Sequence, residues 1–211
     1  MGLPEVLARI ERAARRAGRD PSGVRLVAVT KGRTPEEIRE KVLAYGDFPL
    51  GESRVQEALP KIEALSGATF HFIGPLQRNK AKFMGRFALV HSLESLRVAE
   101  ALNRRLERVL EVLVEVNVGR EPQKHGVLPE ALPDLLGALG ELPRLRVVGL
   151  MTVAPRRADP RRLRAVFAEL SRLADRYNLP ERSMGMSEDF ELAVEEGATL
   201  VRVGRAVFDE L

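Results

Sequence analysis

The sequence of 211 residues contains no cysteine, only three histidines and no long apolar run. The lack of cysteine excludes disulfides, thiolate zinc sites and a cysteine nucleophile. Three histidines (His71, His91 and His125) argue against a His-rich metal site, and we expect no metal. No stretch approaches the roughly 20 apolar residues of a membrane span. Residues 1–19 mix acids with arginines, unlike a signal or transit peptide. These absences predict a soluble, cytoplasmic protein.

Lysine is scarce, although the chain is basic. It carries 34 basic and 30 acidic residues, and six of the basic residues are lysines, which leaves 28 arginines. Most arginines are interleaved with acids, as in residues 104–107, which predicts a mixed, solvated surface rather than a phosphate-binding stripe. The segment 156–164 is the least diluted by acids. It keeps a nucleic-acid binder open as an alternative.

Short apolar runs alternate with amphipathic stretches along the whole chain, after an opening helix. Candidate strands lie at residues 24–30, 48–51, 69–73, 88–91, 112–118, 145–151, 182–185 and 200–203. Candidate helices begin at Thr34, an N-cap followed by Pro35, and lie at residues 52–65, 77–83, 92–107, 129–140, 160–177 and 188–196.

Eight strands in strict alternation with helices predict an α/β fold, a (β/α)8 TIM-type barrel with an extra N-terminal helix. The alternative is an open doubly wound sheet. No Gly-x-Gly-x-x-Gly motif follows the first strand, so a dinucleotide site has no support. No linker interrupts the chain, and we expect one domain, residues 1–211.

Barrel enzymes place their sites at the carboxyl ends of the strands, so Lys31 is the first candidate. Alternation puts Val27, Val29 and Lys31 on one face of the first strand. A lysine among apolar side chains loses solvation, which favours the neutral amine that Schiff-base chemistry needs. The alternative is a lysine whose charged end reaches out of the barrel mouth.

The last strand carries Arg202 on one face with Leu200 and Gly204. An arginine in apolar surroundings needs an acceptor because it does not lose its proton. Gly204 leaves a bare backbone N–H at the start of an expected last helix, and Ser187 follows the seventh strand as a candidate N-cap. Loops at these positions bind phosphate in many barrels. The alternatives are a structural Arg202 paired with a carboxylate and a Ser187 that only caps a helix.

A lysine, an obligate cation and a phosphate cradle together suggest a phosphorylated aldehyde. Pyridoxal 5'-phosphate fits, with its aldehyde at Lys31, its ring nitrogen at Arg202 and its phosphate at the segment that begins with Gly204.

The chain also resembles the pyridoxal phosphate homeostasis proteins, a family of single barrels similar to the N-terminal domain of alanine racemase. The resemblance rests on six runs in the family's order: AVTK at 28–31, GESRVQE at 51–57, FHFIGPLQRNK at 70–80, GLMT at 149–152, SMGMSEDF at 183–190 and VRVG at 201–204. The family is regarded as binding, buffering or delivering the cofactor, usually without assigned catalysis.

The resemblance implies that Lys31 forms the internal aldimine and that Arg202 faces the pyridine nitrogen. It implies that Ser187, Gly204 and residue 205 hold the phosphate. The family commonly has Asn-Tyr where this chain has Ser53-Arg54, and Thr or Ser where it has Arg205. Arg205 either adds a charge-assisted contact to the phosphate or points to solvent. The expected cofactor-binding residues are therefore Lys31, Ser53, Met151, Met186, Ser187, Arg202, Gly204 and Arg205.

Met151 and His71, which are expected near the cofactor, have two interpretations each. Met151 either packs against the cofactor ring or belongs to the core. His71 shares a face with Thr69 and Ile73, and we expect a satisfied interior histidine rather than a group lining the mouth.

These observations predict a binding protein for pyridoxal 5'-phosphate, with client apoenzymes as transient partners and a monomeric state. An arginine leaves the ring nitrogen an acceptor, so the ring is a weak electron sink and strong catalysis is not expected. A minimal enzyme such as an amino-acid racemase is the alternative. Against it, the only tyrosines, Tyr45 and Tyr177, lie away from the predicted strand ends.

Overall fold

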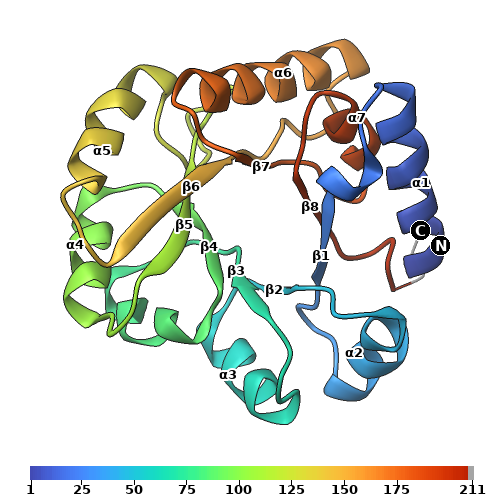
Figure 1. Cartoon of the computed structure of the whole chain (residues 1–211), viewed down its shortest axis with the longest axis horizontal. Coiled ribbons are helices and arrows are strands. Elements are labelled where there is room, and N and C mark those ends of the chain that lie inside the picture. The colour runs from blue at the N-terminus through green and yellow to red at the C-terminus, as the bar shows by residue number, and fades with distance from the viewer. Residues whose placement is uncertain (209–211) are drawn as a thin grey trace.

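The alternating strands and helices close into a parallel barrel in the computed structural model, which describes residues 1–208. Neighbouring strands pair in sequence order, and β8 pairs with β1 to close the sheet (Figure 1). The predicted (β/α)8 architecture is confirmed. The last three residues of the expected 1–211 domain lie outside the described part of the chain.

The strands are short, and their bounds follow the predicted runs. They are β1 (Arg25–Val29), β2 (Leu50–Glu52), β3 (Phe70–Phe72), β4 (Leu89–Leu93), β5 (Leu110–Glu115), β6 (Leu145–Met151), β7 (Glu181–Ser183) and β8 (Leu200–Val203).

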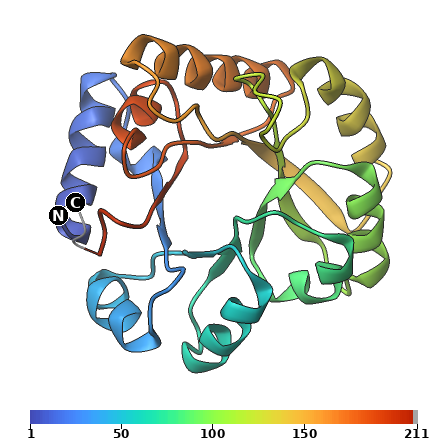
Figure 2. The ribbon, with the colours of Figure 1, turned by 180° about the vertical axis from the view of Figure 1, so that it is seen from behind.

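Helices surround the barrel in both views of Figures 1 and 2. The α-helices are α1 (Leu3–Arg16), α2 (Pro35–Lys41), α3 (Val55–Ala64), α4 (Leu96–Arg105), α5 (Leu132–Leu139), α6 (Pro160–Arg176) and α7 (Phe190–Glu195). Short 3-10 helices are η1 (Pro21–Gly23), η2 (Leu43–Tyr45), η3 (Arg78–Arg86) and η4 (Pro129–Ala131). The predicted extra helix is α1, which packs beside α7. The Gly2 amide donates to the Ala206 carbonyl oxygen at 2.8 Å, so the described ends of the chain meet.

The start of α2 is the predicted one. The Thr34 hydroxyl accepts a hydrogen bond from the Glu37 amide at 3.1 Å, and the Glu37 carboxylate accepts one from the Thr34 amide at 2.8 Å. This capping box satisfies two backbone donors that the helix itself leaves unpaired.

Three predicted elements differ from the structure. The segment predicted as a helix at 77–83 is the 3-10 helix η3, whose sequence is polar and contains Gly85. The fifth strand ends at Glu115 instead of residue 118, because the Asn117 side chain bonds both the amide and the carbonyl of Glu121 and so turns the chain. The helix expected at 188–196 is the shorter α7.

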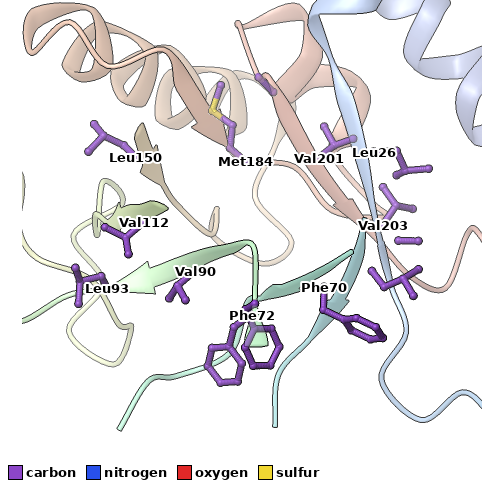
Figure 3. Close-up of a cluster of buried hydrophobic side chains, with 14 of the residues drawn as sticks. Leu26, Phe70, Phe72, Val90, Leu93, Val112, Leu150, Met184, Val201 and Val203 are labelled. Carbon is purple, nitrogen blue, oxygen red and sulfur yellow. The ribbon is translucent and has the colours of Figure 1, made fainter. Parts of the chain in front are cut away.

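Apolar side chains form two layers around the barrel wall. Outward-facing side chains of the strands pack under the helices, and Figure 3 shows several of them, including Leu26, Phe72 and Val201. A separate cluster fills the barrel interior: Val27, Leu89, Leu113, Met151 and Leu200, with Val148 and Val153 at its margin. The barrel is therefore packed inside, and a ligand has to bind at its mouth.

The arginine-rich segment 156–164 is partly bound by the protein itself. Arg164 forms ion pairs with Glu195 at 2.5 Å and Glu196 at 3.3 Å. Arg162 donates to the Gly119 carbonyl oxygen at 3.1 Å. Within residues 1–208, no helix is both long enough and apolar enough to cross a membrane.

Gly149 gives a test of how closely β6 and β7 approach. A Cβ at this position would lie 2.2 Å from the Glu181 carbonyl oxygen of β7. On its other side, Gly149 lies where the pairing of β5 with β6 shifts register. We therefore expect Gly149→Ala to lower the free energy of unfolding by about 2 kcal/mol or more in urea titrations.

Gly137 provides the matched control. It lies inside α5, and a Cβ added there would have no neighbouring atom within 4 Å. Gly137→Ala should raise the free energy of unfolding by up to about 1 kcal/mol. Equal effects of the two substitutions would contradict the close approach of β6 and β7.

Candidate functional site

Lys31 lies in a turn just past the carboxyl end of β1. Val27 is fully buried and Val29 half-buried, but Lys31 is exposed. The expected desolvation among apolar side chains is therefore wrong for this structure. The physical reason is that β1 ends at Val29, so the turn carries Lys31 beyond the barrel wall. Of the two predicted alternatives, a lysine at the open mouth is the one observed.

Arg202 of β8 points into the barrel, where it is only 4% exposed. Its Nη1 donates to the Ser183 hydroxyl at 2.6 Å and its Nη2 donates to the Thr152 carbonyl oxygen at 3.1 Å. Burial lowers the pKa of Arg202 to about 10, against the opposing effect of Glu115 and Asp189. The guanidinium thus stays a cation at neutral pH, held by a hydroxyl and a carbonyl.

A chain of buried side chains continues behind Arg202. Ser183 Oγ lies 2.8 Å from His91 Nδ1, and His91 Nε2 lies 3.0 Å from His71 Nδ1. Because arginine only donates, the Ser183 hydroxyl accepts from Arg202, and the two histidines extend the hydrogen-bonded chain from Ser183 to β3.

Both histidines in this chain are neutral at physiological pH. Burial lowers the pKa of His71 to about 4, and burial also lowers the pKa of His91. The expectation that His71 is a satisfied interior residue is confirmed. His91 was missed, although it lies two residues after the interior Leu89 on the same strand.

The loops after β7 and β8 meet beside the mouth. The Ser187 hydroxyl accepts a hydrogen bond from the Ala206 amide at 3.4 Å. Ser187 is not the N-cap of the next helix, as the sequence suggested: α7 begins at Phe190, and Asp189 occupies the N-cap position. The last helix expected after Gly204 is absent from the described residues: 205–208 form a turn, in which the Phe208 amide donates to the Gly204 carbonyl at 3.2 Å.

Gly204 and Arg205 occupy different surroundings. Gly204 packs against the end of β1, since a Cβ there would lie 3.2 Å from the Cβ of Val29. Arg205 is exposed and forms an ion pair with Glu188 at 3.0 Å. Of the two predicted positions for Arg205, it therefore points to solvent.

The remaining predicted residues are spread around the barrel end. Met186 is 44% exposed in the loop after β7, whereas Met151 is 2% exposed in the interior cluster, so Met151 belongs to the core. Ser53 follows β2 and lines a pocket of about 170 Å³ with Arg54, Pro75 and Lys80, among others. A pocket of about 450 Å³ lies at the opposite, amino-terminal end of the strands, beside Val24 and Pro49.

Two charged residues that the sequence analysis did not select also lie near the mouth. Glu115 ends β5 and is 7% exposed; burial, helped by the nearby Glu94, raises its pKa to about 7. Lys124 donates to the Ala154 carbonyl oxygen at 2.7 Å and so fastens the loop after β5 to the loop after β6. The signal for Glu115 was available: it alternates with the interior Leu113.

Comparison with known proteins identifies the family. The chain matches the family described as alanine racemase, N-terminal domain, over residues 3–210. It is 50% identical to the pyridoxal phosphate homeostasis protein of Deinococcus radiodurans, over 99% of this chain and 100% of that protein. This chain belongs to the pyridoxal phosphate homeostasis protein family. The Escherichia coli member is 37% identical over 98% of this chain and 94% of its own length.

Solved structures agree with the barrel. The structure of PipY from Synechococcus elongatus with PLP bound superposes with a TM-score of 0.80 at 36% identity, over 95% of this chain and 99% of that one. Alanine racemase from Corynebacterium glutamicum superposes with a TM-score of 0.67 at 17% identity, over 99% of this chain and 61% of that one. At that identity the second likeness concerns the fold alone.

The raised pKa of Glu115 predicts a pH-dependent stability. A group with a folded-state pKa of about 7 and an ordinary value of 4.5 stabilises the fold below pH 4.5, and this contribution is lost as the pH rises through 7. Replacing the carboxyl with an amide removes that loss. We expect Glu115→Gln to be more stable than the original chain at pH 8, by up to about 3 kcal/mol, with the gain shrinking toward pH 4.5.

Urea titrations of both proteins from pH 4.5 to 8 measure this difference. Glu111→Gln on the same strand is the control, because Glu111 is exposed, and its effect should change little with pH. A Glu115→Gln effect that is constant across the range would contradict the buried position of the carboxyl.

Proposed function

We propose that this chain binds pyridoxal 5'-phosphate reversibly at the mouth of its barrel and passes it on to apoenzymes. The observation that carries the proposal is the pairing of β1 with β8, in which Val27 lies opposite Arg202. This register puts a fixed buried cation and the exposed Lys31 turn at the same end of adjacent strands. The membership of the family, and the PLP-bound structure of PipY, support the choice of cofactor.

The residues at the mouth fit such a group by their chemistry. Arginine has five N–H donors, and the bonds to Ser183 and Thr152 leave others for a ring nitrogen. The Ser187 hydroxyl and the Arg205 amide, at the start of the turn after Gly204, would donate to a phosphate. Ser53 and Met186 would flank it, Met151 would form the apolar floor, and Arg205 would exchange Glu188 for a phosphate oxygen.

Lys31 supplies the reactive amine. The aldehyde of this cofactor condenses with a primary amine and releases water, which is the chemistry that the group brings when it is bound. The exposure of Lys31 allows this amine to be reached from solvent and by a client protein. An exposed amine suits reversible binding and delivery of the cofactor better than a buried amine would.

Binding without strong catalysis is the form of the proposal that the residues support. Arg202 keeps its proton, so the ring nitrogen stays an acceptor and electron withdrawal is weak. Tyr45 ends η2, before β2, and Tyr177 is the C-cap of α6, before β7, so both lie at the amino-terminal end of the strands, away from the mouth.

The first test is covalent capture. The loaded protein should be yellow, and borohydride reduction should fix the cofactor mass on the peptide that contains Lys31. Lys31→Ala should abolish both signals, whereas Lys82→Ala, which removes an exposed lysine of η3, should change neither. Attachment to another peptide would overturn the assignment of Lys31.

The second test concerns Arg202. Loss of a hydrogen bond from a charged, buried donor typically weakens binding by about tenfold or more. We therefore expect Arg202→Ala to raise the dissociation constant for pyridoxal 5'-phosphate at least that much in an absorbance titration. An unchanged constant would remove Arg202 from the site.

The third test separates a binding protein from an enzyme. We expect α-proton exchange on a panel of amino acids to be no faster with the loaded protein than with free cofactor. If exchange is faster, the same assay with Glu115→Gln shows whether Glu115 moves the proton. Exchange that Lys31→Ala abolishes would refute the binding-only form of the proposal.

A further inference from the structure

A buried charged cluster lies beside the turn that carries Lys31. We infer that Glu52, Lys61 and Glu57 are positioning residues, which hold the backbone on both sides of Lys31 so that its amine is presented to the aldehyde. This inference rests on the proposed function, because it assigns a role in cofactor capture to residues that do not themselves touch the cofactor.

The turn determines where the Lys31 amine can go. The Arg33 amide donates to the Thr30 carbonyl at 3.0 Å, which closes a four-residue turn with Lys31 and Gly32 in its centre. Gly32 has φ of 76°, the left-handed conformation that favours glycine at this position of a type II turn. Within residues 1–208, the Lys31 side chain has no hydrogen-bond partner, so its position depends on the backbone.

The residue before Lys31 is held by the Glu52–Lys61 pair. Lys61 of α3 donates to the Thr30 carbonyl oxygen at 2.6 Å and to Glu52 Oε2 at 3.0 Å. The Thr30 hydroxyl donates to the same Glu52 oxygen. Thr30 is thus fixed through its main chain and its side chain at once.

The residue after Lys31 is held from the same helix. The Gly32 amide donates to Glu57 Oε1 at 2.7 Å, and Glu57 lies 3.8 Å from Lys61. The two peptide groups that flank Lys31 therefore share one support. This support consists of the end of β2, which carries Glu52, and the first two turns of α3.

Burial of the Glu52–Lys61 ion pair has a high desolvation cost, so a contribution to fold stability does not by itself account for the cluster. The side chains of Lys61 and Glu52 are 7% and 0% exposed. Burying an ion pair removes the favourable hydration of both ions, and an apolar pair of similar volume is often as stable. In addition, Glu52 Oε1 is buried with no hydrogen-bond partner among the described residues, and burial raises the pKa of Glu52. The charged pair instead provides a specific hydrogen bond, because it holds the Lys61 ammonium against the Thr30 carbonyl oxygen.

The test separates capture by Lys31 from binding of the rest of the cofactor. Lys61→Met removes the donor but leaves Glu52 charged and unpaired, so the double substitution Glu52→Leu with Lys61→Met removes both charges and keeps the volume. Lys82→Met is the control for losing a lysine. Circular dichroism and thermal unfolding establish that each variant is folded.

Two ligands are compared on each variant. The first is pyridoxal 5'-phosphate, followed by the rate at which the visible band grows and by the yield of borohydride-fixed mass on Lys31. The second is pyridoxine 5'-phosphate, which has the same ring and phosphate but no aldehyde. We expect the double variant to capture pyridoxal 5'-phosphate about tenfold more slowly or worse, while its affinity for pyridoxine 5'-phosphate changes less than twofold.

Each outcome decides between roles. Capture at the original rate in the folded double variant would overturn the inference. Equal losses for the two ligands would also overturn it, since they would indicate a structural role for the pair. If the original chain itself shows no mass on Lys31, then the proposed function fails, and this result is distinct from either of the others.

A second variant tests the other half of the cluster. Glu57→Ala removes the acceptor of the Gly32 amide and leaves the Glu52–Lys61 pair in place. We expect slower capture with unchanged pyridoxine 5'-phosphate affinity, and Glu57→Gln, which keeps an acceptor oxygen, should restore the rate. Failure of Glu57→Gln to restore it would remove Glu57 from the group of positioning residues.

Discussion

Closure of the sheet by the β1–β8 pair is the constraint on which the site depends. The two strands are more than 170 residues apart in the chain, yet their register sets Val27 beside Arg202 and Ala28 beside Val203. Everything at the mouth follows from this: the lysine turn after β1, the turn after Gly204, and the contact of Gly204 with Val29. Because parallel strands point the same way, all of their loops are gathered at one end.

The barrel interior divides into an apolar part and a polar part. Five apolar side chains fill part of the space between the strands. Beside them, Arg202, Ser183, His91 and His71 form one hydrogen-bonded chain from β8 to β3. A buried guanidinium needs acceptors, and the serine hydroxyl that accepts from it is itself hydrogen-bonded to a neutral histidine. The histidines therefore support Ser183, which in turn holds the Arg202 guanidinium in one orientation.

Lys31 is held in position differently from Arg202. Arg202 is fixed through its side chain, whereas Lys31 is exposed and is fixed through the peptide groups on either side of it. In the proposed function Lys31 forms and breaks a covalent link, so its amine needs freedom of movement while its backbone needs a fixed position. The buried cluster on β2 and α3 meets the second need without restricting the first, which is why a costly ion pair at this place has a functional explanation.

The sequence by itself determined the barrel, its extra helix and the capped start of α2, since these follow from local periodicity. Residue chemistry at the strand ends predicts Lys31 and Arg202 as site residues. It did not determine that Lys31 is exposed, that Ser187 bonds the Ala206 amide instead of capping α7, or that Met151 is core. Nor did it indicate that His91, Glu115 and the Glu52–Lys61 pair are buried in the barrel. The physical reason is that burial and hydrogen-bond partners are set by register and packing between distant segments, and these distances exist only once the sheet has closed.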